Sequence, residues 1–258
     1  MPDLGYDGLR VIALAGVPDM QAGDDLARAI VERCRATGNV PVDGDVVVIA
    51  QKVVSKAEDR YVDLALVVPS EHARALASIT GKDARLVEVI LGESRRVVRA
   101  ARDVLIVEHR LGCVMANAGV DRSNVGPDAD ERVLRLPADP DGSAARLRDA
   151  LQQAFGVRLG VIINDSFGRP WRLGTVGIAL GVAGVPALVD LRGMDDRYGR
   201  RLTATLVGHA DEIASAASLV MGQADEGRPV VIVRGLRARA AASTAKALLR
   251  PADEDLFR

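Results

Sequence analysis

The chain has 258 residues, 48% of them hydrophobic and 3% aromatic, and a formal net charge of −1 at pH 7. This length allows one large domain or two small ones, each with a hydrophobic core. The balanced charge argues against a nucleic-acid partner and against an acidic disordered protein. The longest uncharged run, 173–189, is shorter than the roughly 20 residues of a membrane helix and contains glycines and a proline, so we expect no membrane segment.

The cysteines and the N-terminal residues bear on the cellular compartment. Cys34 and Cys113 are too few for a disulfide scaffold, and their spacing does not match a zinc site. The first ten residues include Asp3 and Asp7 and lack the apolar core of a signal peptide. We therefore expect a protein of the reducing cytoplasm.

Hydrophobic patterning in the first half of the chain predicts strands and helices in irregular alternation. A strand over 9–15 precedes a helix that Asp24 is placed to cap, with an apolar face of Leu26, Ile30, Val31 and Cys34. The next strand, 45–50, ends in a polar cluster of Gln51, Lys52, Ser55 and Lys56. The remaining elements predicted in this half are helices at 70–80 and 83–91, a strand at 104–107, an apolar piece at 113–115 and a loop over 116–124.

The second half centres on a β-branched strand, 160–163, that runs directly into Asp165 and Ser166. A predicted loop over 165–175 follows, with Arg169, Trp171 and Arg172. The other predicted elements are a helix at 143–155, strands at 186–191, 202–207 and 229–233, and helices at 211–221 and 243–249. This order predicts a mixed α/β or α+β fold with a partly antiparallel sheet and shows no internal repeat.

Polar residues gather in four predicted loops, 17–20, 51–56, 117–124 and 165–175, with 221–227 as a possible fifth. Their oxygen donors are Asp121, Asn124, Asp165, Ser166 and Gln223, and their cations include Lys56, Arg169 and Arg172. Oxygen ligands without His or Cys favour Mg²⁺ or Mn²⁺ over zinc. Cations beside such a metal suit a polyphosphate, so the inventory points to phosphoryl chemistry.

Each of these residues also has an ordinary structural interpretation. The strand at 160–163 could simply be followed by a surface loop, and Asp121 fits an Asx turn. Lys56 lies in a charged run typical of a solvated surface, Trp171 is typical of a packing residue, and Gln223 of an exposed one. The chain contains no P-loop, no Gly-x-Gly-x-x-Gly and no Gly-x-Ser-x-Gly, so a nucleotide site here would be unconventional.

Five ordered segments carry a family resemblance across almost the whole chain. They are Gly44–Lys56, Ala118–Asn124, Ile163–Arg172, Ala210–Ala214 and Met221–Gln223. With these segments the chain resembles the coenzyme F-420-0:L-glutamate ligases, the γ-glutamyl ligases that extend the deazaflavin coenzyme F-420.

The resemblance implies an α+β fold with mixed, partly antiparallel sheets, flanking helices, two intimately connected subdomains and an intertwined homodimer. It implies that 1–258 is a single ligase unit without the nitroreductase-like domain that is fused to some bacterial relatives. The implied activity is a GTP-dependent addition of L-glutamate to coenzyme F-420-0, with two divalent ions, Mg²⁺ or Mn²⁺, and K⁺.

Site residues carry over motif by motif. The resemblance implies that Asp121 and Asp165 hold one metal, that Ser166 and Gln223 hold the second, and that Lys56 is catalytic together with the two carboxylates. The implied GTP contacts are Val17, Pro18, Asp19, Met20, Gln51, Lys56, Asn124 and the loop 221–228, with Met221, Gly222 and Gln223. Two departures stand out, since some members have a small hydroxyl residue at position 51 and others have Thr at position 166.

The implied mechanism has two steps. A carboxylate of the acceptor attacks the γ-phosphate of GTP to give an acyl phosphate and GDP, and the amine of L-glutamate then displaces phosphate. Three alternatives remain open at this point: the same chemistry on another phosphorylated carboxylic acid, a nucleotide-binding dimer without catalysis, and a phosphohydrolase. Retention of Asp121, Asp165, Ser166 and Gln223 argues against a degenerate site. The number of glutamates added is not indicated.

Overall fold

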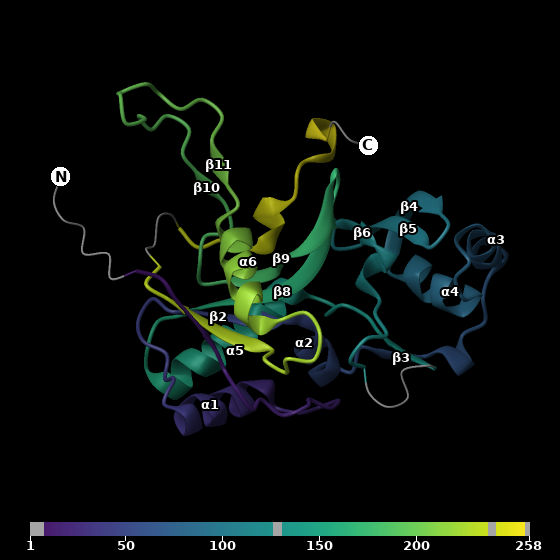
Figure 1. Ribbon diagram of the computed structural model, residues 1–258, viewed down its shortest axis with the longest axis horizontal. Helices are drawn as coiled ribbons and strands as arrows, with labels where there is room; N and C mark the ends of the chain where they lie inside the picture. Colours follow the sequence, from purple (N-terminus) through teal and green to yellow (C-terminus); the bar gives the residue numbers. More distant parts are fainter. Residues whose placement is uncertain (1–7, 126–130, 237–240, 256–258) are drawn as a thin grey trace.

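A mixed β-sheet organises the larger part of the molecule (Figure 1). The computed structural model describes residues 8–125, 131–236 and 241–255, so the N-terminal stretch with Asp3 and Asp7 lies outside the described residues. The strand order in the sheet is β1 (Arg10–Ala13), β12 (Val230–Arg234), β2 (Val46–Ala50), β8 (Gly160–Arg169) and β9 (Arg172–Ala183). Strands β2 and β8 run parallel, with Val48 opposite Ile162, whereas the other neighbours in this order are antiparallel.

Helices cover both faces of this sheet. Helices α1 (Leu26–Thr37) and α5 (Pro140–Phe155) pack on one face, where Ile30 and Leu151 belong to the same cluster as Val47. Helix α6 (His209–Met221) packs on the other face, where Ile213 belongs to the same cluster as Val48. Burial on both faces explains why the central strands have continuous apolar sequences and do not alternate.

A smaller subdomain packs beside the main sheet. Strands β4 (Ser94–Ala101), β5 (Val104–His109) and β6 (Val114–Ala116) form an antiparallel sheet, against which α3 (Glu71–Thr80) and α4 (Ala84–Gly92) pack. The connecting region contains α2 (Gln51–Ala57), β3 (Tyr61–Asp63), β7 (Arg132–Leu134) and the 3₁₀ turns Leu64–Leu66 and Asn117–Gly119. The structure thus confirms the α+β class with mixed and antiparallel sheets.

Two β-hairpins project from the body of the molecule in Figure 1. One is the outer part of β8 and β9, and the other is the arm between β10 (Val189–Asp190) and β11 (Leu206–Val207). None of the helices in the described part of the chain has the length and apolar character needed to cross a membrane.

Several predicted boundaries are wrong for local reasons. Asp25, and not Asp24, caps α1 by accepting from the backbone N–H of Arg28, while Asp24 accepts from that of Gln21. Helix α5 begins earlier than predicted, because Asp139 caps it and Pro140 occupies its first turn. The helix predicted at 243–249 is the short 3₁₀ turn Ala245–Leu248, and a second such turn covers Ala252–Glu254.

Candidate active site

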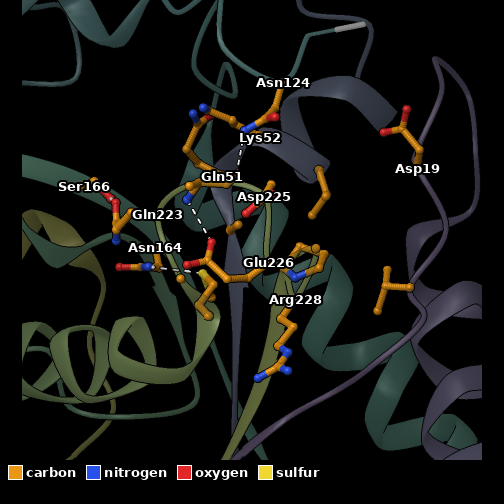
Figure 2. Close-up of a pocket in the computed structure, with 18 of the residues that line it drawn as sticks. Asp19, Gln51, Lys52, Asn124, Asn164, Ser166, Gln223, Asp225, Glu226 and Arg228 are labelled. Atoms are coloured by element: carbon orange, nitrogen blue, oxygen red, sulfur yellow. Dashed lines mark hydrogen bonds between the residues drawn. The ribbon is translucent and has the colours of Figure 1, made fainter.

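A cavity of about 700 Å³ opens where β2 ends and its parallel pairing with β8 stops, at Ala50 opposite Asn164. Strand β8 continues beyond this point, and its residues 164–166 line the cavity together with residues that follow β2. The loop after β1, the helix α2 and the loop after α6 complete the walls (Figure 2). This arrangement brings together segments that are far apart in the sequence.

The cavity collects most of the residues that the resemblance assigns to the nucleotide. The residues of that set that line it are Val17, Pro18, Asp19, Gln51, Lys56, Asn124, Met221, Gly222 and Gln223. Met20 is not among the described lining residues, because its side chain is 1% exposed and packs in the main core. Any contact of Met20 with a ligand would therefore have to come from its backbone.

Residues 51–56, predicted to be a loop, form most of helix α2. Val53 and Val54 turn into the core, while Lys52 and Lys56 are one helical turn apart and both line the cavity. Lys56 is only 5% exposed and its Nζ lies 2.6 Å from Oδ1 of Asp19. The solvated-surface interpretation of Lys56 is thus wrong.

Residues 165–175, also predicted to be a loop, form the outer part of the β8–β9 hairpin. The two strands pair from Val161 with Ala183 to Arg169 with Arg172, with a register shift between Ile163 and Asn164. Such a bulge redirects side chains and is common beside functional sites. Here it immediately precedes Asp165.

The hairpin tip does not contribute to the cavity. Trp171 is 90% exposed on the single chain, so it is not part of the core of that chain. Arg169 and Arg172, predicted to face a polyphosphate, are absent from the described residues that line the cavity. Its cationic groups among those residues are Lys52, Lys56 and Arg228.

The pair expected to hold the second metal is in direct contact. The Ser166 hydroxyl donates a hydrogen bond of 2.6 Å to Oε1 of Gln223, which comes from the loop after α6. Both side chains are exposed at the cavity. Their oxygen atoms therefore lie close enough to face one cation.

One of the two carboxylates expected to hold the first metal, that of Asp121, is paired with a lysine. Nζ of Lys52 lies 2.7 Å from Oδ2 of Asp121, and the Asx turn predicted for Asp121 is also present, because the backbone N–H of Ser123 donates to its Oδ1 over 2.8 Å. Burial acts to raise the pKa of Asp121, but Lys52 and Ser123 outweigh it and the pKa lies below its usual value. Asp121 itself is not among the described residues that line the cavity.

The pKa of Asp165, unlike that of Asp121, lies above its usual value. Burial raises the pKa of Asp165, the Ser166 N–H and Lys52 partly oppose this, and the negative charge of Asp121 adds a smaller rise, so that the pKa is about 6. The charges of Asp121 and Lys52 therefore act on the pKa of Asp165 in opposite directions.

The chemistry of these donors fits Mg²⁺ or Mn²⁺. In the part of the chain that the structure describes, no three His, Cys, Asp or Glu residues gather into one cluster. The expected ligand sets instead combine carboxylates with a hydroxyl and an amide oxygen. Mg²⁺ typically binds one or two carboxylates and completes its shell with water and substrate phosphates, whereas zinc prefers His and Cys.

Sequence reasoning gave no role to two residues of the site, Lys52 and Asn164, which both line the cavity. Asp225, Glu226 and Arg228 of the loop 221–228, which the resemblance assigns to the nucleotide, line it as well. The backbone N–H of Ala224 donates to Oε2 of Glu226 over 2.8 Å, which shapes the loop from within. Lys52 could have been found from its spacing of four residues from Lys56 if the helix had been recognised.

Comparisons with known proteins show the family to which the chain belongs. The family model described as F420-0:Gamma-glutamyl ligase matches residues 16–235. A protein of Methanothermobacter thermautotrophicus named "Coenzyme F420:L-glutamate ligase" is 48% identical over 256 residues, covering 97% of this chain and 99% of that protein. A protein of the same name from Methanopyrus kandleri is also 48% identical, with the same two coverages, and one from Archaeoglobus fulgidus is 42% identical over 97% of this chain and 96% of its own length. The chain therefore belongs to the F-420-0:γ-glutamyl ligase family.

Proposed function

We propose that the protein is a GTP-dependent ligase that adds L-glutamate to coenzyme F-420-0, releasing GDP and phosphate. The observation that carries the proposal is the meeting of Asp165, Ser166 and Gln223 with Lys52 and Lys56 at one cavity. Hard oxygen donors and cations at one place suit a metal-bound triphosphate. The description of the family, which names F420-0, and the names of the relatives, which name L-glutamate, support this choice of acceptor and amino acid.

The proposed chemistry has two steps. A carboxylate of the acceptor attacks the γ-phosphate of GTP, so that a bond forms between the carboxylate oxygen and phosphorus and GDP leaves. The amine of L-glutamate then attacks the acyl carbon, the new amide bond forms, and phosphate leaves with the bonding electrons. Activation is needed because a carboxylate is a poor electrophile.

The residues of the cavity have distinct tasks in this scheme. Lys52, Lys56 and Arg228 neutralise the phosphate charge, and the loops 17–20 and 221–228 hold the nucleotide. Asp121 with Asp165, and Ser166 with Gln223, would hold the two divalent cations, which when bound supply charge neutralisation at the triphosphate. K⁺ is the third ion that we propose for the site.

The test is a reconstituted reaction. The protein is incubated with GTP, Mn²⁺, L-glutamate and unglutamylated coenzyme F-420, and the products are analysed by mass spectrometry together with GDP release. The expected result is a product heavier by one or more glutamyl residues, with GDP formed only when both co-substrates are present. GDP release without them would favour a phosphohydrolase, and nucleotide binding without turnover would favour a non-catalytic dimer.

We also propose that the protein forms a homodimer through its projecting hairpins. Trp171 and Leu173 are 90% and 99% exposed on one hairpin, and Tyr198 is 88% exposed on the other. Large apolar side chains at projecting tips suit burial against a second copy. Light scattering should give twice the mass of the chain, and Trp171→Ser with Leu173→Ser should shift the equilibrium towards the monomer. A wild-type protein that stays monomeric at high concentration would contradict this proposal.

A further inference from the structure

Lys52 occupies a special position at the candidate metal site. Its ammonium contacts Oδ2 of Asp121 at 2.7 Å and also donates to the hydroxyl of Ser123. A univalent cation is therefore already in contact with one of the two carboxylates expected at the first metal.

Lys52 also belongs to the cavity wall. It lies in the first turn of α2, lines the cavity, and appears with Gln51 and Asn124 along one rim in Figure 2. Its side chain is 27% exposed, so its ammonium has room to move. A lysine head on a flexible four-carbon stem can exchange partners without moving the helix.

We propose that Lys52 is a built-in placeholder for the divalent cation: its ammonium neutralises Asp121 in the metal-free protein, and metal binding displaces it towards the nucleotide phosphates. The proposal rests on the metal assignment of the proposed function. A divalent cation and an ammonium cannot both contact one carboxylate oxygen without strong repulsion. Lys52 therefore competes with the metal for Asp121 before the nucleotide binds, and compensates phosphate charge afterwards.

The position of Asp121 does not depend on Lys52. Its backbone exchanges hydrogen bonds with Leu134, at 3.0 Å from the Asp121 N–H and 2.9 Å to its carbonyl. Its carboxylate also accepts from the Ser123 N–H. Removal of the lysine should therefore leave the carboxylate in place and open to a cation.

This geometry separates a placeholder from a supporting residue. If Lys52 only supported the loop, its loss would weaken metal binding. If Lys52 competes with the metal, its loss strengthens metal binding in the absence of nucleotide. Lys56 provides a control of equal charge, because it lies one turn further along α2 and its partner is Asp19.

The experiment measures Mn²⁺ binding to nucleotide-free protein by electron paramagnetic resonance, with circular dichroism to confirm folding. We expect Lys52→Met to lower the Kd for Mn²⁺ by about tenfold, because a nearby like charge is removed. Lys56→Met should change it by less than about threefold, because its charge lies beside another acid. In an Asp121→Asn background the effect of Lys52→Met should disappear, as a double-mutant cycle requires for a specific pair.

Three outcomes would overturn the proposal. Lys52→Met could bind Mn²⁺ as tightly as the wild type or more weakly, or Lys56→Met could gain as much Mn²⁺ affinity as Lys52→Met. The third outcome is that Lys52→Met still raises the Mn²⁺ affinity in the Asp121→Asn background. The reaction assay keeps this result separate from the proposed function. If the wild type forms glutamylated product but Lys52→Met does not shift the Mn²⁺ affinity, the proposed function stands and the role of Lys52 is contradicted. If Lys52→Met shifts the Mn²⁺ affinity but the wild type forms no product, the role of Lys52 stands and the proposed function is contradicted.

Discussion

The hydroxyl of Ser166 and the amide oxygen of Gln223 lie 2.6 Å apart and join strand β8 to the loop that follows helix α6. These residues come from separate motifs, yet their oxygens point at the same region of the cavity (Figure 2). Two oxygen-bearing side chains in contact in this way can separate to hold a cation between them. Substitution of one of the two residues is the most direct test of the second metal site.

Gln223→Ala should lower kcat by roughly 10²-fold, because it removes an oxygen from the group that stabilises developing charge. The matched control is Ser166→Thr, which keeps the hydroxyl and should stay near wild type. The measurement is the initial rate of product formation over a range of Mn²⁺ concentrations. Full activity of Gln223→Ala at every Mn²⁺ concentration would remove Gln223 from the metal site.

The two carboxylates should matter at least as much. Asp165→Ala and Asp121→Ala are each expected to lower turnover by roughly 10²-fold or more, because each removes a ligand expected at the first metal. Asp149→Ala is the control, since Asp149 is an exposed residue of α5 that pairs with Arg148. Turnover near wild type in either site variant would show that the assignment of the first metal is wrong.

The sequence predicted the central strands well but misjudged the segments that follow them. Residues 46–50 and 160–163 are apolar on both faces, which burial on both sides of a sheet requires. The polar residues after them resemble loops, because their side chains face a cavity and not a core. Helix α2 also lacks a side-chain cap at Ala50, so the usual signal of a helix start is missing.

The sequence also misjudged part of the β8–β9 hairpin. Gly168 and Pro170 favour a turn, and a turn exists, but only Pro170 and Trp171 lie between the two strands. Trp171 adopts a positive φ of 65° there, which places its ring in solvent. The sequence did not predict strand β4, because Arg95, Arg96 and Arg99 interrupt its apolar pattern.

The raised pKa of Asp165 predicts how the metal-free protein responds to pH. The pKa of about 6 in the folded state lies above the ordinary aspartate value of 3.8, so the folded state binds this proton more tightly than the unfolded state. The contribution of Asp165 to stability is therefore full below about pH 4 and is lost as the pH rises towards 6. With a chelator present, Asp165→Asn should be more stable than wild type at pH 8 by roughly 1–3 kcal/mol.

Thermal melts of both proteins from pH 4 to pH 8 check this prediction. The two curves should converge at the acidic end and separate through the window between about pH 4 and pH 6. Excess Mn²⁺ should reverse the order at pH 8, because the wild type gains a bound ion that Asn at 165 holds poorly. Parallel curves across the whole range would contradict the raised pKa.

A buried carboxylate at Glu93 ties the smaller subdomain to the segments around α2. Glu93 is 3% exposed, and three guanidinium groups lie near it: Arg110 at 2.7 Å, Arg135 at 3.2 Å and Arg60 at 3.4 Å. Burial acts to raise the pKa of Glu93, but His109 and the arginines lower it below its usual value. The stabilisation is therefore present at neutral pH and lost as the pH falls below about 4.

Glu93→Gln should destabilise the protein by about 1–3 kcal/mol at pH 7, because it leaves the partly buried Arg60 and Arg135 without their counter-charge. The control, Arg102→Gln, changes an exposed residue and should cost less than about 0.5 kcal/mol. Urea denaturation at pH 7 measures both. Equal midpoints for the two variants would mean that the Glu93 cluster contributes little.

Gly177 controls how closely β9 approaches α6, and through α6 it positions the cavity loop. A Cβ at this glycine would lie 2.2 Å from Oγ of Ser218 and 2.6 Å from the carbonyl oxygen of Ala214. Since the second contact is backbone, α6 has to shift to accommodate an added methyl group. Helix α6 ends at Met221, where the loop that lines the cavity begins.

Gly177→Ala should therefore lower stability by about 1–3 kcal/mol and also raise the KM for GTP, because overpacking displaces both the helix and the loop. Gly168→Ala is the matched control in the same hairpin, since no described atom lies within 4 Å of its added Cβ. Melting temperature and GTP titration in the ligase assay measure the two effects. Loss of stability with an unchanged KM would show that the loop holds its position independently of α6. Loss of stability together with a raised KM would show that the geometry of the cavity depends on a single close contact between strand and helix.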